Sequence, residues 1–164
     1  MRNATDVTMR NYRPGDFGLI IKRHAEMYSQ EFGYPLNFET YVVEAIAKFA
    51  KALDPEKDRI FIAERGPEFL GSAAIQMVSA KQAQLRFVLV EAAARGLGLG
   101  RQLVSEAVQH AQSVGARTVK LETASNLLAA RTLYDSLGFV FIAQTTADFL
   151  PSGVLSETWQ LTLP

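Results

Sequence analysis

The sequence predicts a mixed α/β fold within a single domain that covers residues 1–164. A length of 164 residues is typical of one domain. Apolar residues recur with strand and helix periodicities in an irregular order along the chain: strand, helix, helix, strand, strand, strand, helix, strand, helix, strand, strand. This order predicts a mixed layer of strands and helices and not an all-parallel sheet.

The composition is that of a globular protein and excludes several functional classes. Hydrophobic residues make up 48% and charged residues 21% of the chain, which excludes disorder as the main state. Lysine plus arginine and aspartate plus glutamate each number 17, and the resulting neutrality argues against a general nucleic-acid or membrane-surface binder. The absence of cysteine excludes disulfides, thiolate metal sites and a cysteine nucleophile. His24 and His110 are too few and too far apart for a histidine-rich metal site, so no metal is expected.

No targeting or membrane-spanning segment is expected. The first six residues lead into no apolar segment of the kind that a secretory signal needs. No window reaches the roughly 18 uninterrupted apolar residues of a membrane span. The sequence therefore predicts a cytoplasmic protein with no membrane partner.

The amino-terminal third predicts a strand and two helices. The alternating segment 7–12 is typical of a strand. Asp16 is the expected N-cap of a helix that runs to about Phe32 and is ended by Gly33. The second helix is predicted from the spacing of its apolar side chains, which are Phe38, Val42, Ala45, Ile46, Phe49 and Leu53.

The middle of the chain predicts three strands. Residues 60–63 and 69–78 form a predicted hairpin with a loop of three to five residues at Arg65-Gly66-Pro67-Glu68. Gly71 lies inside the second of these strands, where glycine indicates a bulge or a bend. Residues 85–90 are the third predicted strand.

Two further helices and three further strands are predicted in the remainder. One helix runs from a glycine-rich turn to Val114, and Gly115 is expected to cap its end. A strand at 118–123 precedes a helix at 127–137, which Gly138 closes. The final strands are predicted at 139–143 and 156–163.

The glycine-rich turn is the most informative motif. Alternate glycines leave the outside of the turn without side chains, so that backbone N–H groups can approach a ligand closely. The following helix directs its first N–H groups and the positive end of its dipole to the same place. The sequence therefore predicts a pyrophosphate-binding turn. Its residues are Arg95, Gly96, Leu97, Gly98, Leu99, Gly100 and Arg101.

Two familiar phosphate-binding motifs fit this turn poorly. A nucleotide P-loop ends in Gly-Lys-Ser/Thr, whereas Gly100 is followed by Arg101 and Gln102. The dinucleotide fingerprint requires a third glycine at the position of Arg101 and lies near the start of a βαβ unit. A turn that serves packing alone is the remaining alternative.

The turn and its surroundings resemble the GNAT superfamily of N-acetyltransferases. The pattern Arg-Gly-x-Gly-x-Gly, opening a helix after a strand, is similar to the acetyl-CoA signature of that superfamily. The resemblance covers most of the chain and is strong from about residue 60 to 141. It also extends to the acetyltransferase half of certain winged-helix regulators, although no winged-helix region is expected here. Further matching segments are 62–64, 69–72, Leu121-Glu122-Thr123, 129–134 and Leu137-Gly138-Phe139.

The resemblance implies a fold, a reaction and a cosubstrate. The implied fold is a mixed, mainly antiparallel, strongly twisted sheet flanked by about four helices. The implied reaction is direct acyl transfer from acetyl-CoA to a primary amine of a small molecule or protein within one ternary complex. A bulged N–H near Val88, Leu89 and Val90 is expected to bind the thioester oxygen.

Two catalytic residues are also expected from the resemblance. Tyr134 matches the tyrosine that protonates the leaving thiolate, although its spacing equally fits a core aromatic. Glu122 is the best candidate for the base that deprotonates the amine, directly or through water, and a solvated carboxylate or an ion pair with Lys120 is the alternative. Glu64 and Glu91 are weaker candidates.

The chain departs from the family pattern at one position. The family usually has asparagine seven residues before the tyrosine, and here that position is Leu127. Asn126 lies one residue earlier, where it is expected either to contact the pantetheine arm or, like Ser125, to cap the helix.

The first two helices are expected to form one wall of the acceptor pocket. Tyr28, Phe32 and Tyr34 are candidates to line that wall, although an aromatic stripe is also typical of a core. His24 and His110 are expected to be structural residues.

Two other functions stay open at this point. One is a catalytically weak CoA-binding sensor or interaction module of the same fold, and the other is an unrelated phosphate-ligand binder. The amine acceptor, the acyl chain length and the oligomeric state also stay open, with a homodimer as one alternative.

Overall fold

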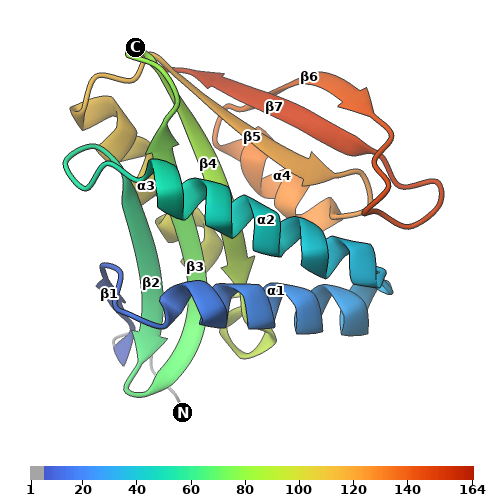
Figure 1. Cartoon of the computed structure of the whole chain (residues 1–164). Coiled ribbons are helices and arrows are strands. Elements are labelled where there is room, and N and C mark those ends of the chain that lie inside the picture. Colours follow the sequence, from blue (N-terminus) through green and yellow to red (C-terminus); the bar gives the residue numbers. More distant parts are fainter. Residues whose placement is uncertain (1–5) are drawn as a thin grey trace. The chain divides into compact units, whose positions relative to one another are not determined.

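The computed structural model describes residues 6–164 (Figure 1). Residues 1–5 lie outside the described part. They belong to the segment in which no secretory signal is expected. The chain forms two compact units: residues up to Arg13, 55–120 and 162–164 make the first, and residues 14–54 and 121–161 make the second. The assignment of a single domain to residues 1–164 stays a prediction.

The predicted mixed α/β fold class is confirmed. The strands belong to one seven-stranded sheet with the order β1-β2-β3-β4-β5-β7-β6. In the described part of the chain, the strands are β1 (Thr8–Arg10), β2 (Arg59–Arg65), β3 (Glu68–Met77), β4 (Gln82–Val90), β5 (Thr118–Ala124), β6 (Val140–Thr145) and β7 (Ser156–Thr162). The helices there are α1 (Asp16–Phe32), α2 (Leu36–Ala52), α3 (Leu99–Ser113), α4 (Leu128–Ser136) and the 3₁₀-helix η2 (Ala92–Ala94). None of these helices combines the length and the apolar character that crossing a membrane requires.

In the first unit, α3 packs on strands β2, β3 and β4. Strands β1 to β4 pair with their sequence neighbours in antiparallel orientation. The helix buries one apolar face, as its periodicity predicts. The buried residues of that face are Leu99, Leu103, Val104, Ala107 and Ala111.

The β2–β3 hairpin is tighter than the sequence predicted. Arg65 pairs with Glu68 in the register, so that only Gly66 and Pro67 form the loop. The expectation of three to five residues is therefore wrong. Gly66 adopts a left-handed φ of 58°, which makes a two-residue connection possible without steric cost.

In the second unit, α1 and α2 pack against each other and β6 pairs with β7 in antiparallel orientation. The edge-to-face contact of Phe17 and Phe49 joins the helices, with ring centroids 6.4 Å apart. Gly33 ends α1 as predicted: it has a φ of 65°, and the Tyr34 N–H donates to the Tyr28 carbonyl.

The predicted N-cap of α1 is wrong by one residue. Gly15 occupies the N-cap and makes no side-chain cap bond. Asp16 is instead the first helical residue and is buried. In the first turn, its charge lies close to the positive end of the helix dipole. Acidic residues are favoured there, as they are at the N-cap.

Gly71 marks a close approach between β3 and β4. A Cβ at this position would lie 2.6 Å from the Leu89 carbonyl oxygen and 3.1 Å from a Leu103 methyl carbon. The predicted irregularity at Gly71 is confirmed, because the β3–β4 register shifts just after it, between Ser72 and Ala74. The missing side chain lets the β4 backbone come close to β3.

We predict that Gly71→Ala lowers the free energy of unfolding by about 1–3 kcal/mol, because the added methyl group meets backbone that cannot move away. Gly18→Ala is the matched control. Gly18 lies in α1, and a Cβ there would meet nothing within 4 Å. This control is expected to gain roughly 0.5–1 kcal/mol, since alanine favours the helix. Urea denaturation measures both, and an equal response of the two variants would contradict the close approach.

Candidate active site

The predicted site residues lie in two groups. The expected cofactor-binding residues 88–90 and 95–101 belong to the first unit. Glu122, Asn126 and Tyr134 belong to the second unit.

The glycine-rich turn connects β4 to α3 through η2. Gly96 and Gly98 have left-handed φ values of 81° and 74°, and Gly98 is the N-cap of α3 with no side-chain cap bond. A Cβ built on either glycine meets nothing within 4 Å, so the outside of the turn is open. The Gln102 N–H donates to the Gly98 carbonyl at 3.1 Å and closes the first turn of the helix.

This turn has the properties of an anion-binding loop. Successive backbone N–H groups around left-handed residues form a concave, positively polarised surface. The first N–H groups of a helix have no acceptor within that helix, and its dipole adds to the same potential. Leu99 is buried and anchors the helix start, whereas Arg95 and Arg101 are exposed on either side. The residues present therefore fit a diphosphate.

The structure contains a β-bulge in β4, close to where a bulged N–H was expected. Ser72 pairs with Leu89 and Ala74 pairs with Arg86, so that Phe87 and Val88 lie opposite the single residue Ala73. Phe87 has a φ of 54°, a left-handed value that is uncommon for a residue with a side chain. The roles expected of Val88, Leu89 and Val90 stay predictions.

Tyr134 is buried in the second unit, near the end of α4. Its ring makes an edge-to-face contact with Phe139, with centroids 5.8 Å apart. Burial raises the pKa of Tyr134 well above its usual value, and the neighbouring Tyr28 adds to the rise. The phenol therefore keeps its proton throughout the physiological pH range.

Asn126 is held by a residue that the sequence did not connect with it. The buried Tyr34 hydroxyl donates to the Asn126 Oδ1 at 2.7 Å. Burial also raises the pKa of Tyr34 above its usual value, with Tyr28 adding to the rise. Tyr34 lies between Gly33 and Pro35, a position that signals a helix end but gives no indication of this partner.

Neither Asn126 nor Ser125 caps α4, so that alternative is wrong. Leu127 occupies the N-cap and makes no side-chain cap bond. The Ser125 Oγ instead accepts a hydrogen bond from the Leu155 N–H at 2.9 Å, and the Ser125 N–H donates to the Leu155 carbonyl at 2.8 Å. Both side chains therefore link the turn to other segments of the same unit.

The aromatic side chains at the end of α1 form one cluster with the start of α2. Tyr28 lies 5.3 Å from Tyr34 and 5.1 Å from Phe38, measured between ring centroids. Phe32 lies 5.7 Å from Tyr28 on the outer side of the cluster and is 36% exposed. His24 stacks on Tyr28, and its Nδ1 lies 2.8 Å from the Ile20 carbonyl oxygen, within its own helix. The suggested contact of Tyr28, Phe32 and Tyr34 with an acceptor stays a prediction.

The candidate carboxylates differ in their surroundings. Glu122 is exposed on β5, whereas Val119 and Leu121 are buried, as the strand alternation predicts. Glu64 is engaged by Arg10, whose Nε lies 2.9 Å from its Oε2.

A buried carboxylate that the sequence did not single out anchors α4. Glu157 on β7 is 2% exposed. Its Oε2 accepts from the Arg131 Nε and from the Trp159 Nε1, each at 3.0 Å. Arg131 precedes Tyr134 by less than one helical turn, so its bond to Glu157 attaches the segment that carries the tyrosine to β7. Alternation along β7 places Glu157 on a buried face, but a sequence shows no partner for it.

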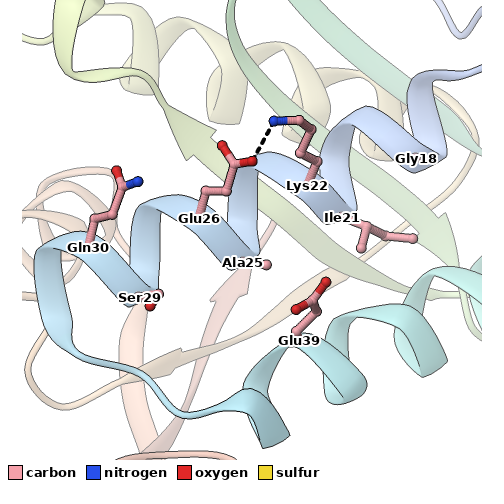
Figure 2. Close-up of a pocket in the computed structure, with 8 residues that line it drawn as sticks. All are labelled: Gly18, Ile21, Lys22, Ala25, Glu26, Ser29, Gln30 and Glu39. Carbon is pink, nitrogen blue, oxygen red and sulfur yellow. Dashed lines mark hydrogen bonds and ion pairs between the residues drawn. The ribbon is translucent and has the colours of Figure 1, made fainter.

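A separate open hollow of about 440 Å³ lies beside α1 and the start of α2 (Figure 2). Lys22 and Glu26 form an ion pair there, and the hydrogen bond from Lys22 lowers the pKa of Glu26. None of the predicted catalytic or cofactor-binding residues lines this hollow. Within residues 6–164, no group of three or more histidine, aspartate and glutamate side chains is placed to hold a metal ion.

Comparison with known proteins gives concordant matches. The acetyltransferase (GNAT) family matches residues 21–139. An uncharacterised N-acetyltransferase of Schizosaccharomyces pombe is 29% identical over 125 residues, which are 76% of this chain and 74% of that protein. An acetyltransferase of Streptococcus agalactiae is 19% identical, with a TM-score of 0.75 over 96% of this chain and 99% of that chain. The Salmonella typhimurium protein yncA, solved with its cofactor acetyl-CoA, is 21% identical, with a TM-score of 0.74 over 97% of this chain and 95% of that chain.

The raised pKa of Tyr134 predicts a loss of stability at high pH. In the unfolded chain a tyrosine titrates near pH 10, whereas the folded protein retains this proton to a higher pH. The folded state therefore binds more protons above about pH 10, and the free energy of unfolding falls as pH rises, by up to about 1.4 kcal/mol per pH unit from this residue. Urea denaturation between pH 8 and pH 11 is expected to show a shallower fall for Tyr134→Phe.

Tyr12→Phe is the control for this series, because Tyr12 is 39% exposed and its surroundings change less on unfolding. It is expected to follow the wild-type pH dependence. Parallel curves for wild type and Tyr134→Phe would show that burial does not hold this proton.

Proposed function

Because the chain belongs to the acetyltransferase (GNAT) family, we propose that this acyltransferase moves an acetyl group from acetyl-CoA to a primary amine by direct transfer within a ternary complex. The observation that carries the proposal is the open glycine-rich turn, in which Gly96 and Gly98 are left-handed and α3 begins. The yncA structure with acetyl-CoA supports the choice of cosubstrate. The cytoplasmic location expected from the sequence stays a prediction.

The proposed cosubstrate contacts lie in the first unit. Backbone N–H groups of residues 96–101 would bind the diphosphate, with Arg95 and Arg101 adding positive charge. The bulge at Phe87 and Val88 would supply an N–H donor for the negative charge that develops on the thioester oxygen. One well-placed donor of this kind is worth about 3–4 kcal/mol of barrier lowering.

Tyr134 is the proposed general acid for the leaving thiolate. A free phenol has a pKa about 1.5 units above a free thiol, which makes proton transfer unfavourable by about 2 kcal/mol. Burial raises the pKa of Tyr134 further. A thiolate that forms in equally dry surroundings is destabilised in the same way, so the pKa values of the phenol and the thiol rise together. Proximity of the two groups then offsets the remaining cost of proton transfer.

Glu122 is the proposed base for the attacking amine, either directly or through water. An amine must lose its proton before it attacks, and a carboxylate can accept that proton. The exposure of Glu122 is compatible with a route through water. The aromatic cluster around Tyr28, Phe32 and Tyr34 is proposed to form one wall of the acceptor pocket.

We predict that Tyr134→Phe lowers kcat by about 100-fold or more for the best amine in a panel, with little change in KM for acetyl-CoA. The substitution removes only the hydroxyl, so the packing on Phe139 is retained. Thiol release from acetyl-CoA measures the rate. Unchanged turnover would remove Tyr134 from the acid role, whereas binding of acetyl-CoA without any product from the wild type would favour a CoA-binding sensor.

Gly98→Leu is expected to weaken CoA binding about tenfold or more, because the side chain fills the outside of the turn and displaces N–H bonds to a charged group. Asparagine tolerates a left-handed φ. Gly98→Asn therefore tests the obstruction by a side chain with little added backbone strain. Gly33→Leu is the control, since Gly33 is also left-handed with open surroundings but caps α1. Calorimetric titration with CoA, ATP and NAD measures the affinities.

Equal CoA affinity in wild type and both Gly98 variants would show that the turn does not bind the diphosphate. Preferential binding of ATP or NAD by the wild type would favour an unrelated phosphate-ligand binder.

A further inference from the structure

Ser72 makes a side-chain hydrogen bond to the irregular part of β4. It lies on β3 and is fully buried, with 0% exposure. Its Oγ donates to the Phe87 carbonyl oxygen at 2.7 Å. This contact is not part of the strand ladder, because the register pairs Ser72 with Leu89. A buried hydroxyl with this partner therefore ties β3 to the bulge itself.

The backbone conformation of Phe87 is a strained one. A left-handed φ is unfavourable for a residue with a side chain, and Phe87 is the only such residue in the described part of the chain. Strain of this kind persists only where the surroundings over-determine it. A regular ladder that places one β4 residue opposite Ala73 is the competing arrangement, and it would move residues 87–90 relative to β3.

Gly71 contributes to the same arrangement from the neighbouring position. The Leu89 carbonyl oxygen lies 2.6 Å from where a Cβ of residue 71 would stand, so only glycine admits the β4 backbone here. Two consecutive β3 residues thus match the bulge, one by lacking a side chain and the other by donating a hydrogen bond. Ser72 lies in the segment 69–72 that resembles the family, but the resemblance gave it no role.

We propose that Ser72 is a positioning residue, which holds the β4 bulge in its left-handed conformation and so directs the N–H that binds the thioester oxygen. The catalytic part of this inference rests on the proposed function. Ser72 acts through the Phe87 carbonyl and does not itself touch the substrate. Its loss leaves the glycine-rich turn intact, so that ground-state binding of acetyl-CoA persists while the transition-state donor is misplaced.

The experiment compares Ser72→Ala with Ile62→Val. Ile62 on β2 pairs with Ser72 and is equally buried. The two substitutions are expected to lower the free energy of unfolding by comparable amounts. Ser72→Ala is expected to lower kcat about 10- to 100-fold with less than about a twofold change in KM for acetyl-CoA, since a displacement of about 1 Å has effects of this size. Ile62→Val is expected to leave both constants near wild type. An equal kcat in the two variants, at equal stability, would overturn the positioning role.

A second variant tests the strain directly. Glycine adopts a left-handed φ without cost, so Phe87→Gly is expected to keep the bulge without help from Ser72. Adding Ser72→Ala to Phe87→Gly is then expected to lower kcat less than about threefold. A full 10- to 100-fold loss in that background would show that Ser72 does not act by holding the conformation of residue 87.

The three-bond HN–Hα coupling of Phe87 reports its φ without any substrate. It is expected to change in Ser72→Ala and to stay at the wild-type value in Ile62→Val. An unchanged coupling in Ser72→Ala would overturn the inference even if the wild type is an active enzyme. If the wild type transfers acetyl to no amine, the proposed function fails, and a changed coupling would still support the structural role of Ser72.

Discussion

The feature on which the candidate site depends is a left-handed backbone, which recurs at Phe87, Gly96 and Gly98 within one short stretch of chain. At Gly96 and Gly98 this conformation belongs to a turn whose outer side is open, because a Cβ on either residue would meet nothing within 4 Å. Main-chain donors have no rotamers to order, so their arrangement is as rigid as the fold around them. The packing of α3 on β2, β3 and β4 supplies that rigidity.

The sequence predicted the elements more accurately than the contacts between them. Apolar periodicity located α1, α2, α3 and α4 but not the short 3₁₀-helix η2, and glycine marked the ends of α1 and α3 because left-handed caps favour that residue. The predictions of the N-cap of α1 and of the length of the hairpin loop were wrong. In both places a glycine with a left-handed φ, Gly15 or Gly66, decides the local structure, and a pattern of side chains does not reveal this.

The shape of the glycine-rich turn could be predicted from local sequence, whereas the hydrogen bonds between side chains far apart in the sequence could not. Alternate glycines before a helix indicate an anion-binding turn from local chemistry alone. Tyr34 and Asn126 are 92 residues apart, and their hydrogen bond follows from tertiary structure that no local pattern encodes. The same holds for Glu157 and Arg131, which are 26 residues apart. A bulged N–H was expected near Val88, Leu89 and Val90 through the family resemblance, whereas phenylalanine gives no signal for the left-handed φ at residue 87.

The bond between Tyr34 and Asn126 ties the turn before α4 to the segment between α1 and α2. An amide group normally offers an oxygen acceptor and an NH₂ donor, and rotation by half a turn exchanges them at little cost. Here the Tyr34 hydroxyl donates to the oxygen, and after such an exchange the same hydroxyl would have to accept from the amide NH₂ group instead. The bond therefore couples two segments that lie 92 residues apart in the sequence. A change at residue 34 is felt by the amide of residue 126, and so at the start of the segment that leads into α4.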